Sequence, residues 1–247
     1  MFDLHCHVLP ALDDGASSLE DTRQLLQLAV ADGISTLVAT PHINPGVFDN
    51  SVDKINLALQ TVVHAGLQLP LQIAAAAEVR LTEHILPAVE QGHLPFLGHY
   101  QGMNVLLLEF PHSHIPAGAD KLVRWLLQRN ILPMLAHPER NRDVQANPAL
   151  LAPFRRMNCL FQLTASSITG ELGERHQQCA QLLAQQRLFH IVASDMHSVL
   201  RRPPRLSQAR QALSRLVDED YAHAITLSQP KALVASLQFY SLQTGNV

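Results

Sequence analysis

The sequence holds little cysteine, few aromatic side chains and no long apolar stretch, and each shortage excludes a class of protein. Its three cysteines, Cys6, Cys159 and Cys179, form no CxxC pair and leave one over, so a disulfide framework is not expected. Uncharged, mainly apolar runs such as residues 103–108 are far shorter than the roughly 20 residues that span a membrane. The formal net charge is −3 with a pI near 6.5, which argues against a nucleic-acid partner.

The first residues of the chain also lack the pattern of a secretory signal. The segment turns polar at Asp3, without a basic start followed by an apolar middle. We therefore expect no such signal and no membrane insertion. The unpaired cysteines indicate a reducing, cytoplasmic compartment.

Histidine, in contrast, is abundant, with 14 residues against three tyrosines and one tryptophan. Short apolar runs, typical of buried parallel strands, alternate with segments of helical spacing. The strands are predicted at residues 2–5, 34–39, 71–77, 104–109, 131–136, 159–164 and 190–193. The helices are predicted near residues 19–32, 52–65, 84–91, 120–129, 147–156, 172–186, 207–217 and 230–237. No linker divides the chain, so we expect one α/β domain over residues 1–247.

Six of the seven predicted strands lead into side chains that can bind a metal. These side chains are His5, His7, His42, Glu78, Glu109, His137, Asp195 and His197. In a closed (β/α) barrel the carboxyl ends of all strands meet in one mouth, where such folds carry their chemistry. An open sheet would hold its outer strands too far apart to share a site. The distribution therefore favours a barrel.

The number and charge of these side chains indicate several ions. His5 and His7 project to the same face of an extended strand, which makes a nitrogen pair suited to zinc, manganese or iron. On the following loop, either Asp13 or Asp14 can add a ligand. With Asp14, five neutral imidazoles and four carboxylates carry a charge of −4. Three divalent ions bring +6 and leave about +2, which would attract a phosphate dianion.

At these positions the sequence resembles the PHP (polymerase and histidinol phosphatase) superfamily of metal-dependent phosphoesterases. It is most similar there to the bacterial protein-tyrosine phosphatases of capsular and exopolysaccharide operons, the CpsB/YwqE family. The motifs are DLHCH at 3–7, DDG at 13–15, VATPH at 38–42, AEVR at 77–80, LEF at 108–110, AHPER at 136–140, ASDMH at 193–197 and RPP at 202–204. They occur in the order of the family and span nearly the whole chain.

The resemblance implies a distorted (β/α)7 barrel of the PHP type, similar to a TIM barrel, with a trinuclear centre. By motif position, His5, His7, Glu78 and Asp195 would bind the first ion. Glu78, Glu109 and His137 would bind the second ion, with Glu78 as the bridge, and Asp14, His42 and His197 would bind the third. Manganese is the expected metal, with iron, zinc, cobalt and magnesium as alternatives. Arg140 and Arg202 match the phosphate-binding arginines of the family.

The implied activity is hydrolysis of phosphotyrosine on a bacterial tyrosine kinase of polysaccharide synthesis and export. A metal-bridging hydroxide would attack phosphorus while the ions and arginines neutralise the phosphate oxygens. A cysteine nucleophile is not expected, because no cysteine begins the Cys-x5-Arg loop that it would need. The alternatives are a small-molecule phosphomonoesterase of the histidinol-phosphatase type and a non-catalytic metal-binding regulatory domain.

Several residues near the motifs keep two interpretations. Arg80 either takes part in the site or forms a structural salt bridge. His112 and His114 either contact substrate or are loop residues without a role in the site. Asp3 is expected to orient a ligand imidazole, and Glu139 is expected to pair with its neighbour Arg140. The sequence leaves the oligomeric state, the physiological metal and the phosphoprotein unspecified.

Overall fold

A computed structural model describes residues 1–243 of the chain; the last four residues of the predicted domain, 244–247, lie outside the described residues. Its strands are β1 (Phe2–Cys6), β2 (Thr36–Ala39), β3 (His42–Ile43), β4 (Gln72–Ala75), β5 (Glu78–Arg80), β6 (Gly98–Tyr100), β7 (Met103–Glu109), β8 (Ile131–Leu135), β9 (Leu160–Thr164), β10 (Ile191–Ala193) and β11 (Tyr240–Ser241).

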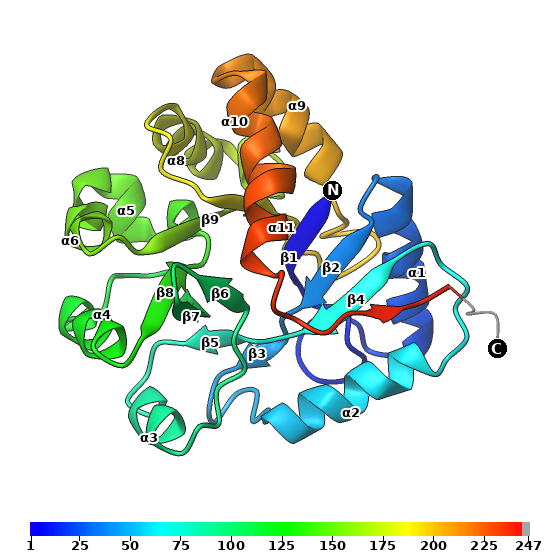
Figure 1. Ribbon diagram of the computed structural model, residues 1–247. Helices are drawn as coiled ribbons and strands as arrows, with labels where there is room; N and C mark the ends of the chain where they lie inside the picture. Colours follow the sequence, from blue (N-terminus) through cyan, green and yellow to red (C-terminus); the bar gives the residue numbers. More distant parts are fainter. Residues whose placement is uncertain (244–247) are drawn as a thin grey trace.

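The helices lie around these strands (Figure 1). They are α1 (Leu19–Ala31), α2 (Val52–Val63), α3 (Ile85–Glu90), α4 (Ala119–Leu127), α5 (Arg142–Ala146), α6 (Ala152–Arg156), α7 (Ala165–Thr169), α8 (Glu174–Gln185), α9 (Leu206–Leu216), α10 (Glu219–His223) and α11 (Gln229–Leu233). Two 3-10 turns, η1 (Pro138–Arg140) and η2 (Pro148–Leu151), and a π-helical turn, η3 (Ala224–Ser228), complete them. No helix within residues 1–243 is long and apolar enough to cross a membrane.

The parallel strands follow one another around a curled, distorted barrel. One sheet has the order β1-β2-β4-β11, and a second has the order β10-β9-β8-β7-β5-β3. Hydrogen bonds from the Ala76 N–H to Ala39 and from the Glu78 N–H to Pro41 lead from the first sheet into the second. The predicted α/β fold of the barrel type is confirmed by this arrangement and by the structural neighbours given below.

A seam between β1 and the end of β10 closes the circuit. The Asp195 N–H donates to the His5 carbonyl at 2.8 Å, and the His7 N–H donates to the Met196 carbonyl at 2.9 Å. Beside them, Asp3 accepts hydrogen bonds from the Ser194 N–H at 2.9 Å and from the Ser194 hydroxyl at 2.5 Å. The seam therefore brings the first and last metal-ligand motifs of the sequence together.

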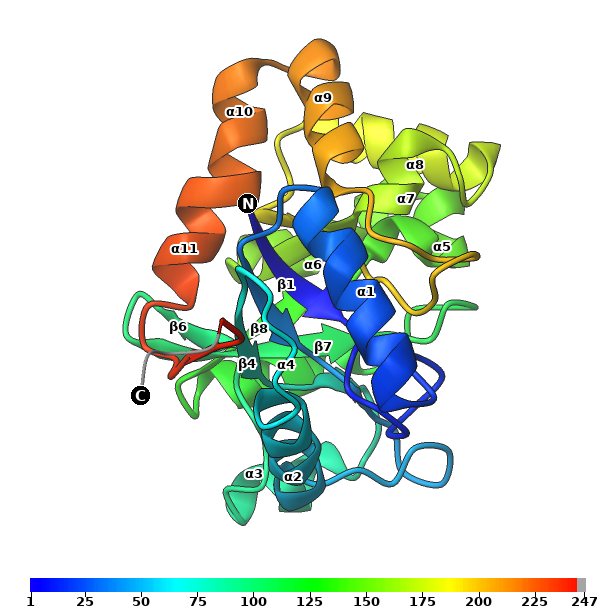
Figure 2. The same ribbon diagram turned by 90° about the vertical axis from the view of Figure 1, so that its right-hand side faces the viewer.

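Local sequence explains most of these elements. The hydroxyl of Ser18 caps α1 by accepting a hydrogen bond from the Asp21 N–H, and two acids lie in the first turn. Every residue of β8 and β9 is buried, as expected where helices cover the outer face of a parallel barrel and side chains fill its interior. Figure 2 shows α1 in front of the strands, with α10 and α11 at the left of the view.

The structure corrects several predicted boundaries. The strands predicted at 34–39 and 71–77 continue, after short breaks, as β3 and β5, so His42 and Glu78 open these second strands instead of following a strand end. The helix predicted at 147–156 is broken into η2 and α6, each with a proline in its first turn. The helix predicted at 230–237 is the end of a helical run from Glu219 to Leu233. The antiparallel strands β6 and β11 were not predicted.

Candidate metal centre

The barrel mouth brings the nine predicted ligand residues together. Within residues 1–243, five overlapping groups of His, Asp and Glu each have ligand atoms within 4.8 Å of one another, and together they include all nine and His112. Seven of the nine are buried: His5, His7, Glu78, Glu109, His137, Asp195 and His197. The side chain of Asp14 is 54% exposed and that of His42 is 14% exposed. The cluster is therefore closed at its base and open on one side.

The imidazoles of His5 and His7 face each other through nitrogens that carry lone pairs. The Nδ1–H of His5 donates to Oε1 of Gln162 at 3.0 Å, and the Nδ1–H of His7 donates to Asp13 at 2.7 Å. When unprotonated, a ring that donates from Nδ1 has a bare Nε2, and the Nε2 atoms of His5 and His7 lie 3.2 Å apart. Such an arrangement is unfavourable unless a proton or a cation lies between the nitrogens.

Glu78 occupies the middle of the cluster and directs its two oxygens to different neighbours. Its Oε1 lies 2.8 Å from Nε2 of His137. Its Oε2 lies 3.2 Å from Nε2 of His5 and 3.0 Å from Nδ1 of His42. A carboxylate that is divided in this way is placed to bridge two cations.

The outer part of the cluster distinguishes Asp13 from Asp14. Oδ2 of Asp13 accepts from His7 and from the His42 N–H, and its Oδ1 accepts from the Gly15 N–H at 3.0 Å. Asp14 instead directs Oδ1 toward the ring nitrogens of His197 at 3.4 Å and His42 at 3.5 Å. The geometry makes Asp13 the residue that orients His7, and leaves Asp14 facing the candidate ion position.

Gly15 holds this loop against the strand. A Cβ at position 15 would lie 2.1 Å from the carbonyl oxygen of His7 and 2.5 Å from its Cβ. The Ala16 N–H donates to that same His7 carbonyl at 3.0 Å. The motif DDG therefore needs its glycine because the loop passes directly over His7.

Asp195 joins the candidate ligands to the two predicted phosphate-binding arginines. Its Oδ1 lies 3.5 Å from Nε2 of both His5 and His7. Its Oδ2 accepts hydrogen bonds from Arg140 and, at 2.5 Å, from Arg202. Both guanidiniums therefore lie at the edge of the mouth, on side chains that are partly exposed.

Two of these residues have a backbone conformation that L-amino acids seldom adopt. His137 has a φ of +30° and Asp195 a φ of +52°. Non-glycine residues in this region cost on the order of 1–3 kcal/mol each and gather at functional sites. Both strained residues lie just after strand ends, where the backbone turns their side chains into the mouth.

Burial and neighbouring charges set the protonation of the cluster. For His5 and His7, burial favours the neutral ring, but the nearby carboxylates outweigh it and raise both pKa values. Burial lowers the pKa of His137 to about 3, helped by the nearby Arg140, and it lowers the pKa of His197 to about 4. Both rings are therefore neutral near pH 7 and offer a lone pair. Burial and the negative charge of Glu78 raise the pKa of Glu109 to about 8. Two carboxylates as close as those of Glu78 and Glu109 repel each other, and bound cations would compensate their negative charge.

Unpartnered atoms provide a test of whether this donor set fits metal ions. Among the described residues, buried polar atoms without a hydrogen-bond partner include Nδ1 of His42, Oε2 of Glu78, Oε2 of Glu109 and Nε2 of His112. Buried polar groups are normally satisfied. Four such atoms in one mouth, all of types that bind Mn²⁺, Fe²⁺ or Zn²⁺, fit a bound metal centre.

The residues with two interpretations now have defined positions. Arg80 pairs with Oε1 of Glu109 at 3.2 Å and also donates to the Phe110 carbonyl. Nε2 of His112 lies 3.6 Å from Oε1 of Glu109, so this residue lies in the mouth. His114 is exposed, and its Nδ1 lies 2.8 Å from the Ser113 hydroxyl.

Gln162 is the residue at this centre that sequence reasoning missed. It lies on β9, the strand that leads into no metal-ligand side chain, and it is fully buried. Its Oε1 accepts both from Nδ1–H of His5 and from the backbone N–H of His137 at 3.1 Å. A buried polar residue on a strand of apolar neighbours was the available signal.

Two expected roles differ in the structure. Asp3 does not contact an imidazole: it binds Ser194 across the seam, and burial raises its pKa to about 6. Glu139 does not pair with Arg140. It accepts hydrogen bonds from the Thr164 N–H and the Ser167 hydroxyl and so holds β9 and α7. Sequence adjacency misled for Glu139, because neighbouring residues of a turning chain point in different directions. For Asp3 the partner is decided by the packing of Ser194 across the seam, which spacing along the chain does not encode.

Comparison with known proteins shows the family to which the chain belongs. The family described as "Capsular polysaccharide synthesis, CpsB/CapC" matches residues 1–235. The chain therefore belongs to the CpsB/CapC family of capsular polysaccharide synthesis proteins. It is 32% identical to the tyrosine-protein phosphatase YwqE of Bacillus subtilis over 92% of this chain and 89% of that protein. It is 26% identical to the tyrosine-protein phosphatase CpsB of Streptococcus pneumoniae, over 95% and 98% respectively.

Solved structures give the same relationship. A structure from a study of YwqE from Bacillus subtilis and CpsB from Streptococcus pneumoniae, described as unique metal-dependent tyrosine phosphatases, superposes with a TM-score of 0.88 at 30% identity and covers 96% of each chain. An organophosphorus hydrolase variant from Deinococcus radiodurans superposes with a TM-score of 0.58 at 14% identity, over 94% of this chain and 92% of that one. The second match shows a shared fold alone.

Proposed function

We propose that this chain is a metal-dependent protein-tyrosine phosphatase that acts on a bacterial tyrosine kinase of capsular or exopolysaccharide synthesis. The observation that carries the proposal is the mouth in which bare imidazole nitrogens face carboxylates beside two guanidiniums. Membership of the CpsB/CapC family and relatives named tyrosine-protein phosphatases support it. The proposal treats residues 1–247 as one catalytic domain in the cytoplasm.

The proposed centre takes three divalent ions, with manganese as the first candidate. His5, His7, Glu78 and Asp195 would hold one ion, Glu78, Glu109 and His137 the second, and Asp14, His42 and His197 the third. Two of the groups contain Glu78, one with His5 and His7 and one with His42 and Glu109, which supports Glu78 as the bridge. When bound, the ions would supply positive charge that polarises a phosphate oxygen and acidifies water.

The side chains of this chain would do the remaining work. Arg140 and Arg202 would turn from Asp195 to the phosphate and hold its oxygens, because the planar guanidinium fork matches two oxygens at once. Asp13 and Gln162 would keep Nε2 of His7 and His5 directed into the mouth by accepting from Nδ1–H. The tyrosine leaving group has a pKa near 10, so it needs modest assistance to depart.

A substrate panel with controlled metal content tests the proposal. Protein stripped by a chelator and reloaded with Mn²⁺ should hydrolyse a phosphotyrosine peptide in preference to a phosphoserine peptide and to small phosphomonoesters such as histidinol phosphate. Elemental analysis of the same sample should find about three ions per chain, the number that the charge of the ligand set favours. A folded, metal-loaded protein that is inert, or that turns over a small metabolite and ignores the peptide, would contradict the proposal.

A further inference from the structure

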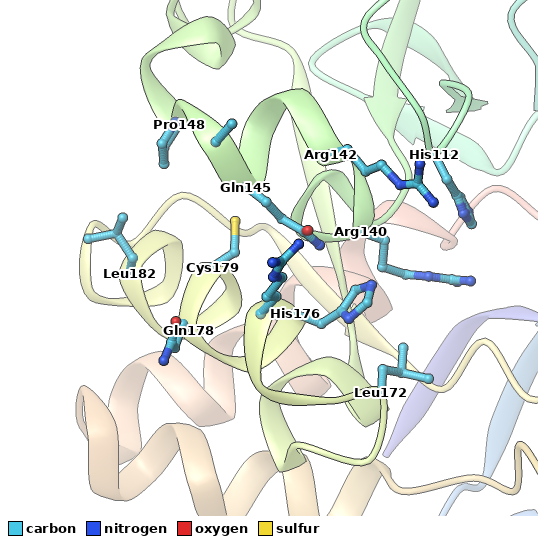
Figure 3. A pocket seen from close by; sticks show the side chains of 12 residues that line it. His112, Arg140, Arg142, Gln145, Pro148, Leu172, His176, Gln178, Cys179 and Leu182 are labelled. Atoms are coloured by element: carbon cyan, nitrogen blue, oxygen red, sulfur yellow. The ribbon is translucent and has the colours of Figure 1, made fainter.

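A groove leads from the mouth of the barrel toward α5 and α8 (Figure 3). It has a volume of about 890 Å³, near the upper end of the range for pockets that enclose a drug-sized molecule. Its first residues are shared with the candidate metal centre: Arg140 reaches Asp195, and His112 lies beside Glu109. The groove is therefore a continuation of the mouth and offers space well beyond what one phosphotyrosine side chain fills.

The charge of the groove is of one sign. Arg140, Arg142 and Arg175 line it, and no acidic side chain of the described residues does. Nearby carboxylates have other partners: Glu174 accepts from Gln178, and Asp143 accepts from the Ile115 N–H. Within residues 1–243 the guanidiniums of Arg142 and Arg175 form no salt bridge. This cationic surface contrasts with a chain whose formal net charge is −3.

Apolar residues complete the lining. Leu172, Pro148 and Leu182 border the groove, and Figure 3 shows Arg142, Gln145 and His176 on the side nearer to Arg140. A surface that combines arginines with apolar side chains suits a polypeptide, which brings carboxylates and apolar groups together. A wholly polar, anionic sugar chain would leave the leucines without a partner.

We propose that this groove binds the substrate polypeptide next to its phosphotyrosine, and that Arg142 and Arg175 select substrates with Asp or Glu in that flanking segment. The inference rests on the proposed phosphatase function and deepens it. Both arginines are exposed, so their effect is one of moderate, salt-dependent attraction. They act on binding of the flanking residues and leave the reacting phosphate to the mouth.

Two phosphotyrosine peptides of equal length test the proposal, one with Asp and Glu on both sides of the phosphotyrosine and one with Ser and Gln. The Mn²⁺-loaded protein should show a kcat/KM about three- to tenfold higher for the acidic peptide, since exposed ion pairs contribute roughly 0.2–1 kcal/mol each. The Arg142→Gln/Arg175→Gln double variant should remove the preference, mainly through KM. It should hydrolyse p-nitrophenyl phosphate, which has no flanking residues, at the unchanged rate.

The matched control is Arg155→Gln/Arg156→Gln, which removes two exposed charges from α6, outside the groove. It should keep the preference for the acidic peptide. Equal kcat/KM for both peptides in the unmodified protein would overturn the groove proposal alone. An equal loss of the preference for the acidic peptide in the two double variants would do the same. So would inhibition by an anionic oligosaccharide in a protein that shows no preference between the peptides. Failure to hydrolyse either peptide or p-nitrophenyl phosphate would instead overturn the proposed function.

Discussion

Two buried carboxylates, one at the seam of the barrel and one at its mouth, have opposite surroundings. Asp3 at the seam accepts hydrogen bonds from the N–H and the hydroxyl of Ser194. At the mouth, Oε2 of Glu78 has no hydrogen-bond donor, although imidazole nitrogens lie 3.0 and 3.2 Å away. Both side chains are fully buried. Burial alone therefore does not distinguish a structural carboxylate from a candidate metal ligand. The distinction lies in whether hydrogen-bond donors face the carboxylate oxygens.

The largest effect is expected when the mouth loses its central carboxylate. Glu78→Ala should abolish metal binding at two of the three positions and lower phosphatase activity by about 10³-fold or more, since ions stabilise the transition state by several kcal/mol. Elemental analysis and turnover of a phosphotyrosine peptide measure both. A Glu78→Ala variant that keeps its full metal content would show that Glu78 is not a metal ligand.

The arginines beside Asp195 should affect turnover without emptying the centre. Arg140→Ala or Arg202→Ala should keep the metal content and weaken transition-state stabilisation by about 2–4 kcal/mol, if each makes a charge-assisted contact with phosphate. Kinetics with a phosphotyrosine peptide and elemental analysis of the same preparation test this division. Loss of metal in either variant would make that arginine a support for Asp195 instead of a phosphate-binding group.

Gln162 tests the contribution of residues that hold the candidate ligands in place by hydrogen bonds. Gln162→Leu removes the acceptor for His5 and for the His137 N–H, and we expect about a 10- to 100-fold loss in metal affinity. Gln162→Glu, which retains an acceptor oxygen, should recover part of that affinity. Titration of the stripped protein with Mn²⁺ measures it, together with a thermal melt to verify folding. Equal affinity in the leucine variant and the unmodified protein would show that His5 needs no such support.

At the seam, the expected effect is on stability. Asp3→Ala leaves the N–H and hydroxyl of Ser194 without acceptors, at about 1–3 kcal/mol for each buried group. The melting temperature of the reloaded protein should fall by several degrees, while the metal content per chain stays the same. Loss of ions from a folded Asp3→Ala protein would show that Asp3 supports metal binding as well as stability.

The smallest effect is expected from the cysteines. Burial raises the pKa of Cys159 and of Cys179 to about 12, and burial raises the pKa of Cys6 well above its usual range. Treatment of the native protein with iodoacetamide at pH 8 should therefore leave activity unchanged, since the thiolate is the reactive form. Mass spectrometry should find the three thiols unmodified until the protein is unfolded. Rapid inactivation would point to a thiol mechanism.

The sequence predicted the strands and the convergence of the site well, because both follow from local patterns. Buried parallel strands are continuous apolar runs, and His5, Glu109 and Asp195 lie at or just beyond the ends of such runs. The antiparallel strand β11 could not be foreseen in the same way. It is two residues long and is defined by its pairing with β4, a contact far away in sequence.

The supporting contacts of the site were the least predictable part. Asp3 and Glu139 were given the wrong partners, because the choice between Ser194, an imidazole or Arg140 depends on how separate strands pack. Gln162 carries no motif, and its role appears only when β9 lies beside β8 and β10. Which oxygen accepts from which ring is decided by tertiary geometry, and spacing along the chain does not encode it.

The bare nitrogens of His5 and His7 have a practical consequence for anyone who purifies this protein. We expect a pocket with these two nitrogens 3.2 Å apart to bind the divalent cations that the expressing cell supplies, in the general order of affinity of the transition metals. Preparations from zinc-rich and manganese-rich media should then differ in occupancy and in specific activity while their folds remain identical. Growth conditions would thus act as a hidden variable in every assay of this chain.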